Sequence, residues 1–463
     1  MEQRALEFVP ESERHGTPRS LFTVWFAANM QITTIVTGAL GVVLGLSLPW
    51  ALVALVVGNV LGGVFMALHS VQGPKLGIPQ MIQSRAQFGV VGAVLPLVLV
   101  ILMYLGFFAS TAVLGGSALA AWTGMPHGVA VIATSAVCTV LAVYGYRLIH
   151  IVERWISLVS GLGFAYLTYR LFTADQPAGM WHAGGFDFGT FLLVVSIAAT
   201  WQIAYAPYVA DYSRYLPRAT GSAPSFWWTY LGAVGASVWM MIFGSVAAAT
   251  APKLFGESSV AYVVGLAPGS LSGFFFLVVI LGAIAVNVLN LYGAFMSTTT
   301  TLSALLRLRV GGGLRAGFIL GASVAGTALA LAGSANFLHN FESFILLLSY
   351  FLVPWTAINL VDFYLIRRER YDVPAMFDPN GRYGRVNWRT LIAYVVGVGV
   401  EVPFVSTEFF TGPMVERLGG ADISWLLGLA VSAGLYYVLL RNHAEPADTP
   451  VASGDAENSA PVH

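Results

Sequence analysis

The sequence predicts an all-α integral membrane protein with twelve transmembrane helices, on the basis of its composition, segment lengths and charge distribution. Of its 463 residues, 57% are apolar and 10% are charged, whereas a typical soluble domain carries about 25% charged residues. The apolar residues form twelve uncharged runs, and most of these approach the roughly 20 residues that a membrane-spanning helix needs. Lysine and arginine are distributed unevenly between the runs, as expected for a multi-pass protein.

The chain begins with a charged segment, residues 1–20, that has no apolar stretch long enough to be a cleavable signal. We expect this segment to lie in the cytoplasm, followed by a transmembrane domain over residues 21–440. Residues 441–463 are polar and rich in proline, alanine and serine, a composition typical of disordered tails. They are therefore predicted to form a disordered cytoplasmic tail.

The predicted spans can be tested against the positive-inside bias, which compares lysine and arginine on the two sides of a membrane. If every run crosses and the N-terminus is cytoplasmic, Arg170, Lys253 and Arg417 lie outside and the remaining 19 of the 22 basic residues lie inside. This asymmetry predicts a multi-pass protein of the cell inner (plasma) membrane with both termini cytoplasmic. The twelve runs are residues 21–47, 50–69, 92–121, 128–146, 155–173, 188–210, 227–250, 270–305, 314–333, 341–366, 389–407 and 423–440.

Charge and cysteine content exclude several classes of function. The 22 basic residues equal the 22 acidic residues in number, so the chain has no net basic field for binding nucleic acid. Cys138 is the only cysteine, and the eight histidines include no pair at metal-ligand spacing, so we expect no disulfide and no metal site. Because no paired acids or activated nucleophile stand in the apolar runs, we expect no enzyme activity and no resident cofactor.

Polar residues interrupt the first run, although such residues are costly at membrane depth unless they face a cavity or a partner. Asn29, Gln31 and three threonines fall within nine residues, in the sequence WFAANMQITTIVTG. This stretch is a poor lipid-facing helix, so we expect the helix to be broken here. Asn29 and Gln31 are candidate binding residues at the break.

The sixth run has a matching interruption. Trp201, Gln202 and Tyr205 stand just before Pro207, whose missing N–H leaves a carbonyl unbonded one turn earlier. The two interrupted runs are five apart, and interrupted helices in matching positions of two halves are typical of inverted-repeat transporters with a site at the midplane. Trp201, Gln202 and Tyr205 are therefore further candidate binding residues.

Runs eight and three carry the remaining candidates. Asn287 and Asn290 are three residues apart and lie on one helical face, where two carboxamides offer donors and acceptors to a neutral heterocycle. Tyr104 and Phe107 supply aromatic faces that can stack on a flat ring. Each of these residues also has a purely structural explanation, because polar side chains bond between membrane helices and aromatic side chains pack.

Three acidic residues near the ends of runs have their own interpretations. Asp211 and Asp362 stand at predicted inner ends beside Arg214 and Arg367, where a solvated salt bridge or a gate latch is expected. Glu401 differs because it lies within run eleven. We expect Glu401 either to pair with another group or to carry a proton.

Motifs outside these candidates connect the chain to a known family. GPKLGIPQMIQSRAQFG, residues 73–89, is similar to a signature loop after the second span, and YVADYSRYLP, residues 208–217, resembles the end of a sixth span. GRYGRVNW, residues 381–388, resembles the loop after a tenth span. Over about residues 15–440 the chain resembles the nucleobase:cation symporter family, and within it the purine and cytosine permease branch.

The resemblance implies a leucine-transporter-type fold, with five plus five helices in inverted repeat and two further helices at the C-terminus. It also implies alternating-access uptake of a nucleobase by symport with a cation. In this family the substrate lies among spans one, three, six and eight. Asn287 and Asn290 match the family's span-eight asparagine motif.

Two departures from the family pattern affect the substrate and the ion. Bacterial cytosine carriers have a glutamine and a tryptophan where this chain has Tyr104 and Phe107, and Gln202 replaces the span-six aromatic. Sodium-coupled members carry two threonines just before the span-eight asparagine, where this chain has Ala285 and Val286. Because a sodium ion needs several oxygen ligands, their loss favours a proton over sodium.

These expectations combine into a monomeric importer of cytosine or a purine base that sits in the lipid bilayer and co-transports a proton or sodium. The same fold carrying allantoin, hydantoin or a vitamin is the alternative. An amino-acid carrier fits less well, because an amino acid needs a half-helix N-terminus for its carboxylate and acceptors for its ammonium. A non-transporting receptor also fits less well, because the sequence shows no soluble output domain.

Overall fold

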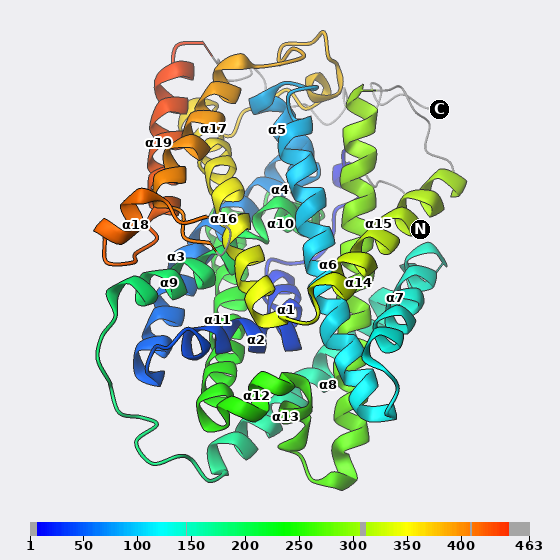
Figure 1. Ribbon diagram of the computed structural model, residues 1–463. Coiled ribbons are helices and arrows are strands. Elements are labelled where there is room, and N and C mark those ends of the chain that lie inside the picture. Colours follow the sequence, from blue (N-terminus) through cyan, green and yellow to red (C-terminus); the bar gives the residue numbers. More distant parts are fainter. Residues whose placement is uncertain (1–6, 145, 306–311, 408–409, 444–463) are drawn as a thin grey trace.

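The computed structural model describes residues 7–144, 146–305, 312–407 and 410–443, which are helical almost throughout (Figure 1). The sole β pairing among these residues is an isolated bridge between Ser406 and Thr411. The all-α class is therefore confirmed. The start of the expected N-terminal segment, residues 1–6, and nearly all of the expected tail, residues 444–463, lie outside the described residues.

The helices follow the predicted runs in order, with short extra helices in the connections. In the first half they are α1 (Arg19–Ala28), α2 (Ile32–Val43), α3 (Leu48–Ser70), α4 (Gln72–Leu76), α5 (Gln80–Phe88), α6 (Val94–Thr123), α7 (His127–Tyr144), α8 (Tyr146–Thr173), α9 (Phe188–Ile203) and α10 (Ala206–Ser213). In the second half they are α11 (Ser222–Thr250), α12 (Pro252–Glu257), α13 (Ser259–Gly265), α14 (Gly269–Leu305), α15 (Gly312–Gly333), α16 (Phe337–Leu360), the π-helix η2 (Val361–Ile366), α17 (Trp388–Glu401), α18 (Pro413–Arg417) and α19 (Ser424–Leu440).

Among the described residues, eight helical stretches are long and apolar enough to cross a membrane, and the bent pair α1–α2 makes a ninth candidate. The other three predicted spans correspond to α8, α17 and α19, which have 28, 14 and 17 residues. With a rise of about 1.5 Å per residue, α17 and α19 are shorter than the roughly 20 residues of a straight crossing. The count of twelve spans stays a prediction.

The two expected interruptions are present. α1 and α2 are bent by 65°, and Gln31 has extended backbone angles (φ −144°, ψ 158°) directly before α2. The sixth run is divided into α9 and α10 at Ala204 and Tyr205, and Pro207 lies in the first turn of α10, where a helix needs no N–H donor. Both breaks place polar helix ends in the interior of the protein.

Glycines bring α2 and α11 close together. A Cβ added to Gly38 would overlap the backbone of Met241, and one added to Gly244 would overlap the carbonyl oxygen of Ile35. α11 also packs against α3, which packs along α9. Such glycines let membrane helices approach closely, and here they hold both broken segments in the middle of the helix bundle.

The segment expected as a signature loop after the second span is helical, because it forms α4 and α5. All nine residues of α5 are buried, and the amide nitrogens of its glutamines donate to polar groups of the protein. Gln80 Nε2 donates to Gln72 Oε1 at 2.9 Å, and Gln72 Nε2 donates to Asn359 Oδ1 of α16 at 2.6 Å. These carboxamides connect the α4–α5 segment to α16.

Asp362 and Arg367 form an ion pair, but the pair is buried. The expectation of a solvated salt bridge was therefore wrong. Asp362 is 0% exposed, and its carboxylate lies 3.2 Å from Arg367 Nε. Tyr371, Tyr436 and Gln87 also donate to this carboxylate. Burial lowers the pKa of the Arg367 guanidinium, but Asp362 and the neighbouring phenols together outweigh this effect and raise that pKa above its ordinary value.

Candidate functional site

A cavity of about 1820 Å³ lies between the broken helices and α6, α8 and α14. It extends from the break between α1 and α2 to Ile82 of α5 and to His15 of the N-terminal segment. Small-ligand pockets usually measure about 300–1,000 Å³. The cavity is therefore large enough for a small ring together with an access path that reaches the α5 end of the protein.

Six of the nine predicted site residues line this cavity. They are Gln31, Tyr104, Phe107, Trp201, Tyr205 and Asn290. Asn29, Gln202 and Asn287 are also buried but are absent from the cavity wall. The sequence candidates thus fall into a group that faces the cavity and a group that lies behind it.

Asn29 lies behind the aromatic wall and holds it in place. Its Oδ1 accepts hydrogen bonds from Trp201 Nε1 at 2.8 Å and from the Tyr205 hydroxyl at 3.1 Å. Ser237 of α11 donates to the same oxygen at 2.7 Å, and Asn29 Nδ2 donates to the carbonyl of Trp25 at 2.9 Å. One carboxamide at the break in the first run therefore orients two rings from the break in the sixth.

Gln202 points away from the cavity, toward α3 and α11. Its Nε2 donates to Asn59 Oδ1 at 2.8 Å and to Ser237 Oγ at 3.0 Å. Asn59 and Ser237 were not among the predicted site residues, because each is an isolated polar residue in an apolar run. Only the folded arrangement shows that both belong to the network behind Trp201.

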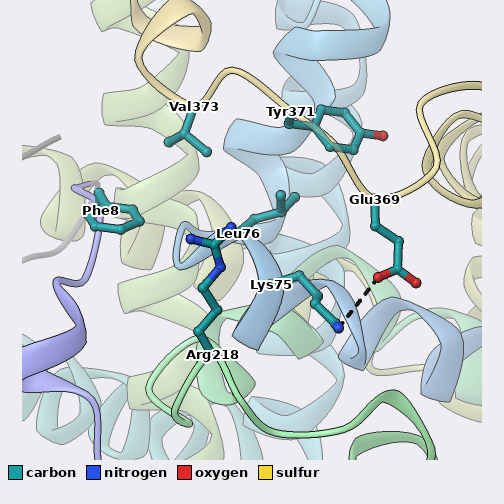
Figure 2. Close-up of a pocket in the computed structure, with 7 residues that line it drawn as sticks. All are labelled: Phe8, Lys75, Leu76, Arg218, Glu369, Tyr371 and Val373. Atoms are coloured by element: carbon teal, nitrogen blue, oxygen red, sulfur yellow. Dashed lines mark ion pairs between the residues drawn. The ribbon is translucent and has the colours of Figure 1, made fainter. Parts of the chain in front are cut away.

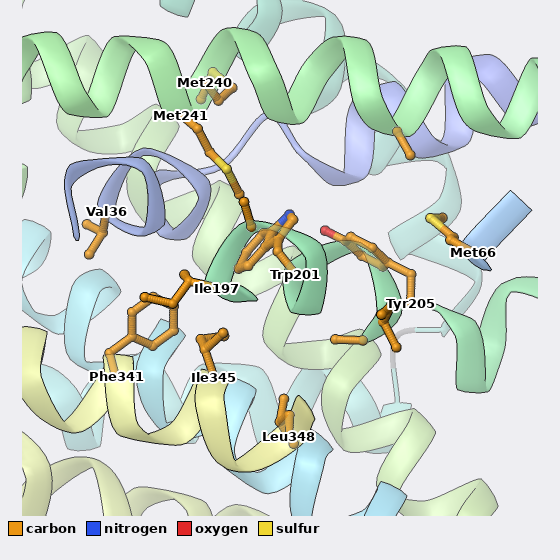
Figure 3. Close-up of a cluster of buried hydrophobic side chains, with 14 of the residues drawn as sticks. Val36, Met66, Ile197, Trp201, Tyr205, Met240, Met241, Phe341, Ile345 and Leu348 are labelled. Atoms are coloured by element: carbon orange, nitrogen blue, oxygen red, sulfur yellow. The ribbon is translucent and has the colours of Figure 1, made fainter. Parts of the chain in front are cut away.

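The cavity wall carries several aromatic rings at steep angles to one another. The rings of Phe107 and Trp201 lie 5.9 Å apart at 87°, and those of Phe107 and Phe344 lie 5.1 Å apart at 84°. In Figure 3, Trp201 lies between Met241 of α11 and Ile345 of α16. Such rings offer a flat ligand one face for stacking and one edge for contact.

Gln31 and Asn290 provide polar atoms beside these rings. Gln31 Nε2 donates to the carbonyl of Ala28 at 2.9 Å, whereas Gln31 Oε1 is buried and accepts no hydrogen bond from a described residue. Asn290 Nδ2 donates to Asn287 Oδ1 at 3.2 Å, and Asn287 Nδ2 donates to the carbonyl of Phe108 at 3.1 Å. Asn287 thus links α14 to α6 and positions Asn290 at the cavity.

The cavity wall also bears on the choice of cation. Ala285 and Val286 line it without a side-chain oxygen, and Asp211 is the sole acidic residue among the described residues that line it. Asp211 Oδ1 accepts a hydrogen bond at 2.7 Å from the backbone N–H of Gln80, at the start of α5. No group of three or more histidine, cysteine, aspartate or glutamate side chains is placed to hold a metal ion in the described residues.

A second, smaller pocket lies near α4, lined by residues such as Phe8, Leu76 and Val373 (Figure 2). Lys75 Nζ and Glu369 Oε2 lie 3.5 Å apart beside it. Its volume is about 20 Å³, which suits one water molecule. This pocket is too small for a heterocyclic ligand, whereas the large cavity has room for one.

Two relatives match this chain over almost its whole length. The chain is 49% identical over 441 residues to YxlA of Bacillus subtilis (strain 168), which is provisionally named a purine-cytosine permease, with 95% of this chain and 96% of the relative covered. It is 28% identical to the purine-cytosine permease fcyB of Emericella nidulans, with 95% and 88% covered.

The fold matches solved structures of the transporter Mhp1. An inward-facing structure of Mhp1 has a TM-score of 0.77 at 21% identity and covers 95% of this chain and 94% of Mhp1. A closed structure with bound bromovinylhydantoin, described as a member of the nucleobase-cation-symport-1 family, has a TM-score of 0.74 at 20% identity, with 95% of each chain covered.

A family of related sequences also matches most of this chain. Residues 8–428 match a family described as permeases for cytosine/purines, uracil, thiamine and allantoin. That range includes both broken helices and every candidate residue of the cavity. Together with the relative at 49% identity, this match shows that the chain belongs to the family of cytosine/purine, uracil, thiamine and allantoin permeases, which are membrane transporters and not enzymes.

Proposed function

We propose that this protein imports a nucleobase, cytosine or a purine, by symport with a cation. The observation that supports this proposal most strongly is the combination of perpendicular aromatic rings and carboxamides at one cavity wall. A nucleobase is flat, uncharged and edged with donors and acceptors, so it can stack on Trp201 or Phe107 while Asn290 and Gln31 bond to its edge. The permease names of the two relatives agree with this substrate class.

The cavity also suits an alternating-access carrier. Phe344 of α16 covers Phe107 on one side, whereas the other end of the cavity reaches His15 and the start of α5. The N-terminal segment is expected in the cytoplasm from the positive-inside bias. On this basis the described conformation opens toward the cytoplasm, in a monomeric plasma-membrane carrier with twelve spans, an inverted repeat and cytoplasmic termini.

A proton is the favoured coupling cation. Ala285 and Val286 contribute no hydroxyl at the positions where the sodium-coupled members have threonines, and they line the cavity. A proton needs only one titratable group, and Asp211 on the cavity wall provides a carboxylate within reach of the cytoplasmic end. This arrangement supports proton coupling more directly than a sodium site with several oxygen ligands.

The alternative substrate is another small ring. The family description includes allantoin and thiamine, and bromovinylhydantoin is bound in one structure of Mhp1. Because the cavity is larger than a single nucleobase requires, its size alone does not select among these rings. The positions of the donors and acceptors on the ligand edge are expected to decide the choice.

A thermal-shift screen of the purified protein tests the substrate class, because a ligand that binds only the folded state raises the apparent stability. We expect cytosine, adenine or hypoxanthine to raise the melting temperature at concentrations at which free amino acids do not. If allantoin or hydantoin raises the melting temperature and no nucleobase does, the substrate assignment is wrong. A shift produced only by amino acids would exclude both ring classes.

A further inference from the structure

One buried carboxyl group lies outside the cavity and has no part in the proposed transport site. Glu401 is the last residue of α17, and its side chain is 0% exposed. Neither Oε1 nor Oε2 accepts a hydrogen bond from a described residue. No lysine, arginine or histidine of the described chain forms an ion pair with it.

α19 packs directly against this carboxyl group. A Cβ added to Gly428 would overlap Glu401 Oε1, and one added to Gly397 would overlap the hydroxyl of Ser432. Gly397 and Glu401 are one turn apart on α17, as are Gly428 and Ser432 on α19. The carboxyl group therefore lies within the tightest part of the contact between α17 and α19.

Among the described residues, the titratable groups that interact with Glu401 are acids or phenols. Asp422, in the segment before α19, adds an unfavourable charge interaction with Glu401. Tyr350 of α16 and Tyr394 of α17 also interact electrostatically with Glu401, but their hydroxyls donate elsewhere. Tyr350 donates to Asp422 Oδ2 at 2.7 Å, and Tyr394 donates to the carbonyl of Phe351 at 3.1 Å.

Asp422 and Glu401 have opposite hydrogen-bond environments. The Asp422 carboxylate accepts bonds from Tyr350, from the backbone N–H of Ser406 at 3.1 Å and from the backbone N–H of Ser424 at 2.9 Å. Such donors stabilise an ionised carboxylate. Glu401 has no such donor among the residues that the structure describes, and a buried charge without a donor or counter-ion is strongly unfavourable, especially beside the negative charge of Asp422.

We propose that Glu401 is a proton-binding site of the folded protein, separate from the central cavity, and that the bound proton holds α17 against α19. Glu401 is absent from the cavity wall, so this proton is resident and is not the co-transported cation. The site is also connected to the substrate region, because α16 bonds to Asp422 through Tyr350 and covers Phe107 through Phe344. Loss of the proton would therefore loosen the contacts of the helix whose Phe344 packs against Phe107 at the cavity wall.

The pH dependence of thermal stability tests this proposal on the purified full-length protein without any substrate. The folded chain holds a proton at Glu401 that the unfolded chain releases near neutral pH, so the wild-type melting temperature should fall as the pH rises. Glu401→Gln and Glu401→Met keep the site neutral at every pH and should abolish this fall. Glu416→Gln, which alters an exposed acid on the adjacent α18, should follow the wild-type curve.

Three results would overturn the proposal. Parallel pH curves for the wild type and Glu401→Gln would show that no proton is linked to folding at this site. Failure of both neutral variants to fold, with Glu416→Gln folded, would show that the site requires a charged carboxylate. Stabilisation by sodium at constant pH that disappears in Glu401→Gln would assign the site to a metal cation instead.

An infrared spectrum provides an independent readout of the same group. The wild type at neutral pH should show the C=O stretching band of a protonated carboxylic acid, and Glu401→Gln should lack that band. A spectrum of the wild type without a protonated carboxyl band would contradict the proposal. Because neither measurement uses a transported compound, failure of this proposal is distinguishable from failure of the proposed function.

Discussion

A single carboxamide oxygen, Asn29 Oδ1, is expected to determine the shape of the binding surface. It accepts hydrogen bonds from Trp201, Tyr205 and Ser237, although Asn29 itself does not reach the cavity wall. The ring positions of Trp201 and Tyr205 thus depend on a residue that the substrate does not touch. Substitution of Asn29 should therefore affect substrate binding through the positions of these two rings.

Asn29→Ala should weaken substrate binding even though no direct contact is removed. Three buried donors would lose their common acceptor, and an unsatisfied buried partner typically costs about 1–3 kcal/mol, which corresponds to a roughly 5- to 150-fold loss in affinity. Equilibrium binding of a labelled nucleobase measures this loss. Ser237→Ala is the matched control and should lower affinity less, because the rings of Trp201 and Tyr205 keep their acceptor. Equal losses of affinity in the two variants would contradict the role of Asn29 in positioning these rings.

Asn290 and Asn287 should respond differently to alanine substitution. Asn290 faces the cavity, so Asn290→Ala should lower nucleobase affinity about 5- to 150-fold by loss of one hydrogen bond, with a smaller fall in melting temperature than Asn287→Ala because it removes only the bond to Asn287. Asn287 bonds to the carbonyl of Phe108, so Asn287→Ala should lower the melting temperature as well as the affinity. Binding and thermal unfolding of both variants provide the comparison, and identical melting temperatures would refute the assigned difference.

At the scale of helices, two ion pairs, each between an acidic and a basic side chain, show how burial changes the contribution of a charged residue to stability. Asp362 and Arg367 are buried together with two phenols and a glutamine, whereas Lys75 and Glu369 pair with about a third of each side chain exposed (30% and 35%). The first pair connects η2 to α5 and α19. The second lies on the surface near α4.

Asp362→Ala should therefore destabilise the protein far more than Glu369→Ala. Removal of one partner of a buried ion pair leaves an uncompensated charge and typically costs about 3–5 kcal/mol, whereas an exposed pair contributes about 0–1 kcal/mol. Thermal unfolding in the same detergent compares the two variants. Equal losses of stability would mean that the Asp362 cluster does not hold η2 in place.

The contact between α2 and α11 provides a second test at this scale. Gly244→Ala should lower the melting temperature, because its Cβ would overlap the backbone of Ile35 and push α2 away. Gly235→Ala on the same helix meets nothing within 4 Å, and alanine is favoured over glycine in a helix by about 1 kcal/mol, so this variant should be neutral or stabilised. A stable, active Gly244→Ala protein would contradict the close approach of the two helices.

The sequence predicted helices and breaks better than connections. The breaks at Asn29 and Pro207 could be anticipated because polar residues and proline are unfavourable in a continuous membrane helix. The buried helix α5 could not, because its glutamines look like loop residues until the fold shows that their amide nitrogens donate to Gln72, to the carbonyl of Ile78 and to Asp362. The sequence also could not show which of Asn287 and Asn290 lines the cavity, because helical spacing places both on one face but does not say which is nearer the cavity.

At the scale of the whole molecule, one large cavity contains the candidate site. The described conformation connects the candidate site to the α5 end of the protein. An importer must also adopt the opposite arrangement, in which Phe344 of α16 no longer covers Phe107. Alternating access is therefore expected to move α16 relative to α6, because the ring of Phe344 packs against the ring of Phe107, which lines the cavity.

Nucleobase import by this protein is tested most directly by uptake of labelled nucleobases into proteoliposomes with independently imposed pH and sodium gradients. The account predicts that cytosine or a purine accumulates, that an inward proton gradient at constant sodium drives this accumulation, and that unlabelled nucleobases compete whereas amino acids do not. Uptake that requires sodium at constant pH would contradict proton coupling. Absence of nucleobase uptake by a reconstituted protein that accumulates another ring compound would contradict the central claim itself.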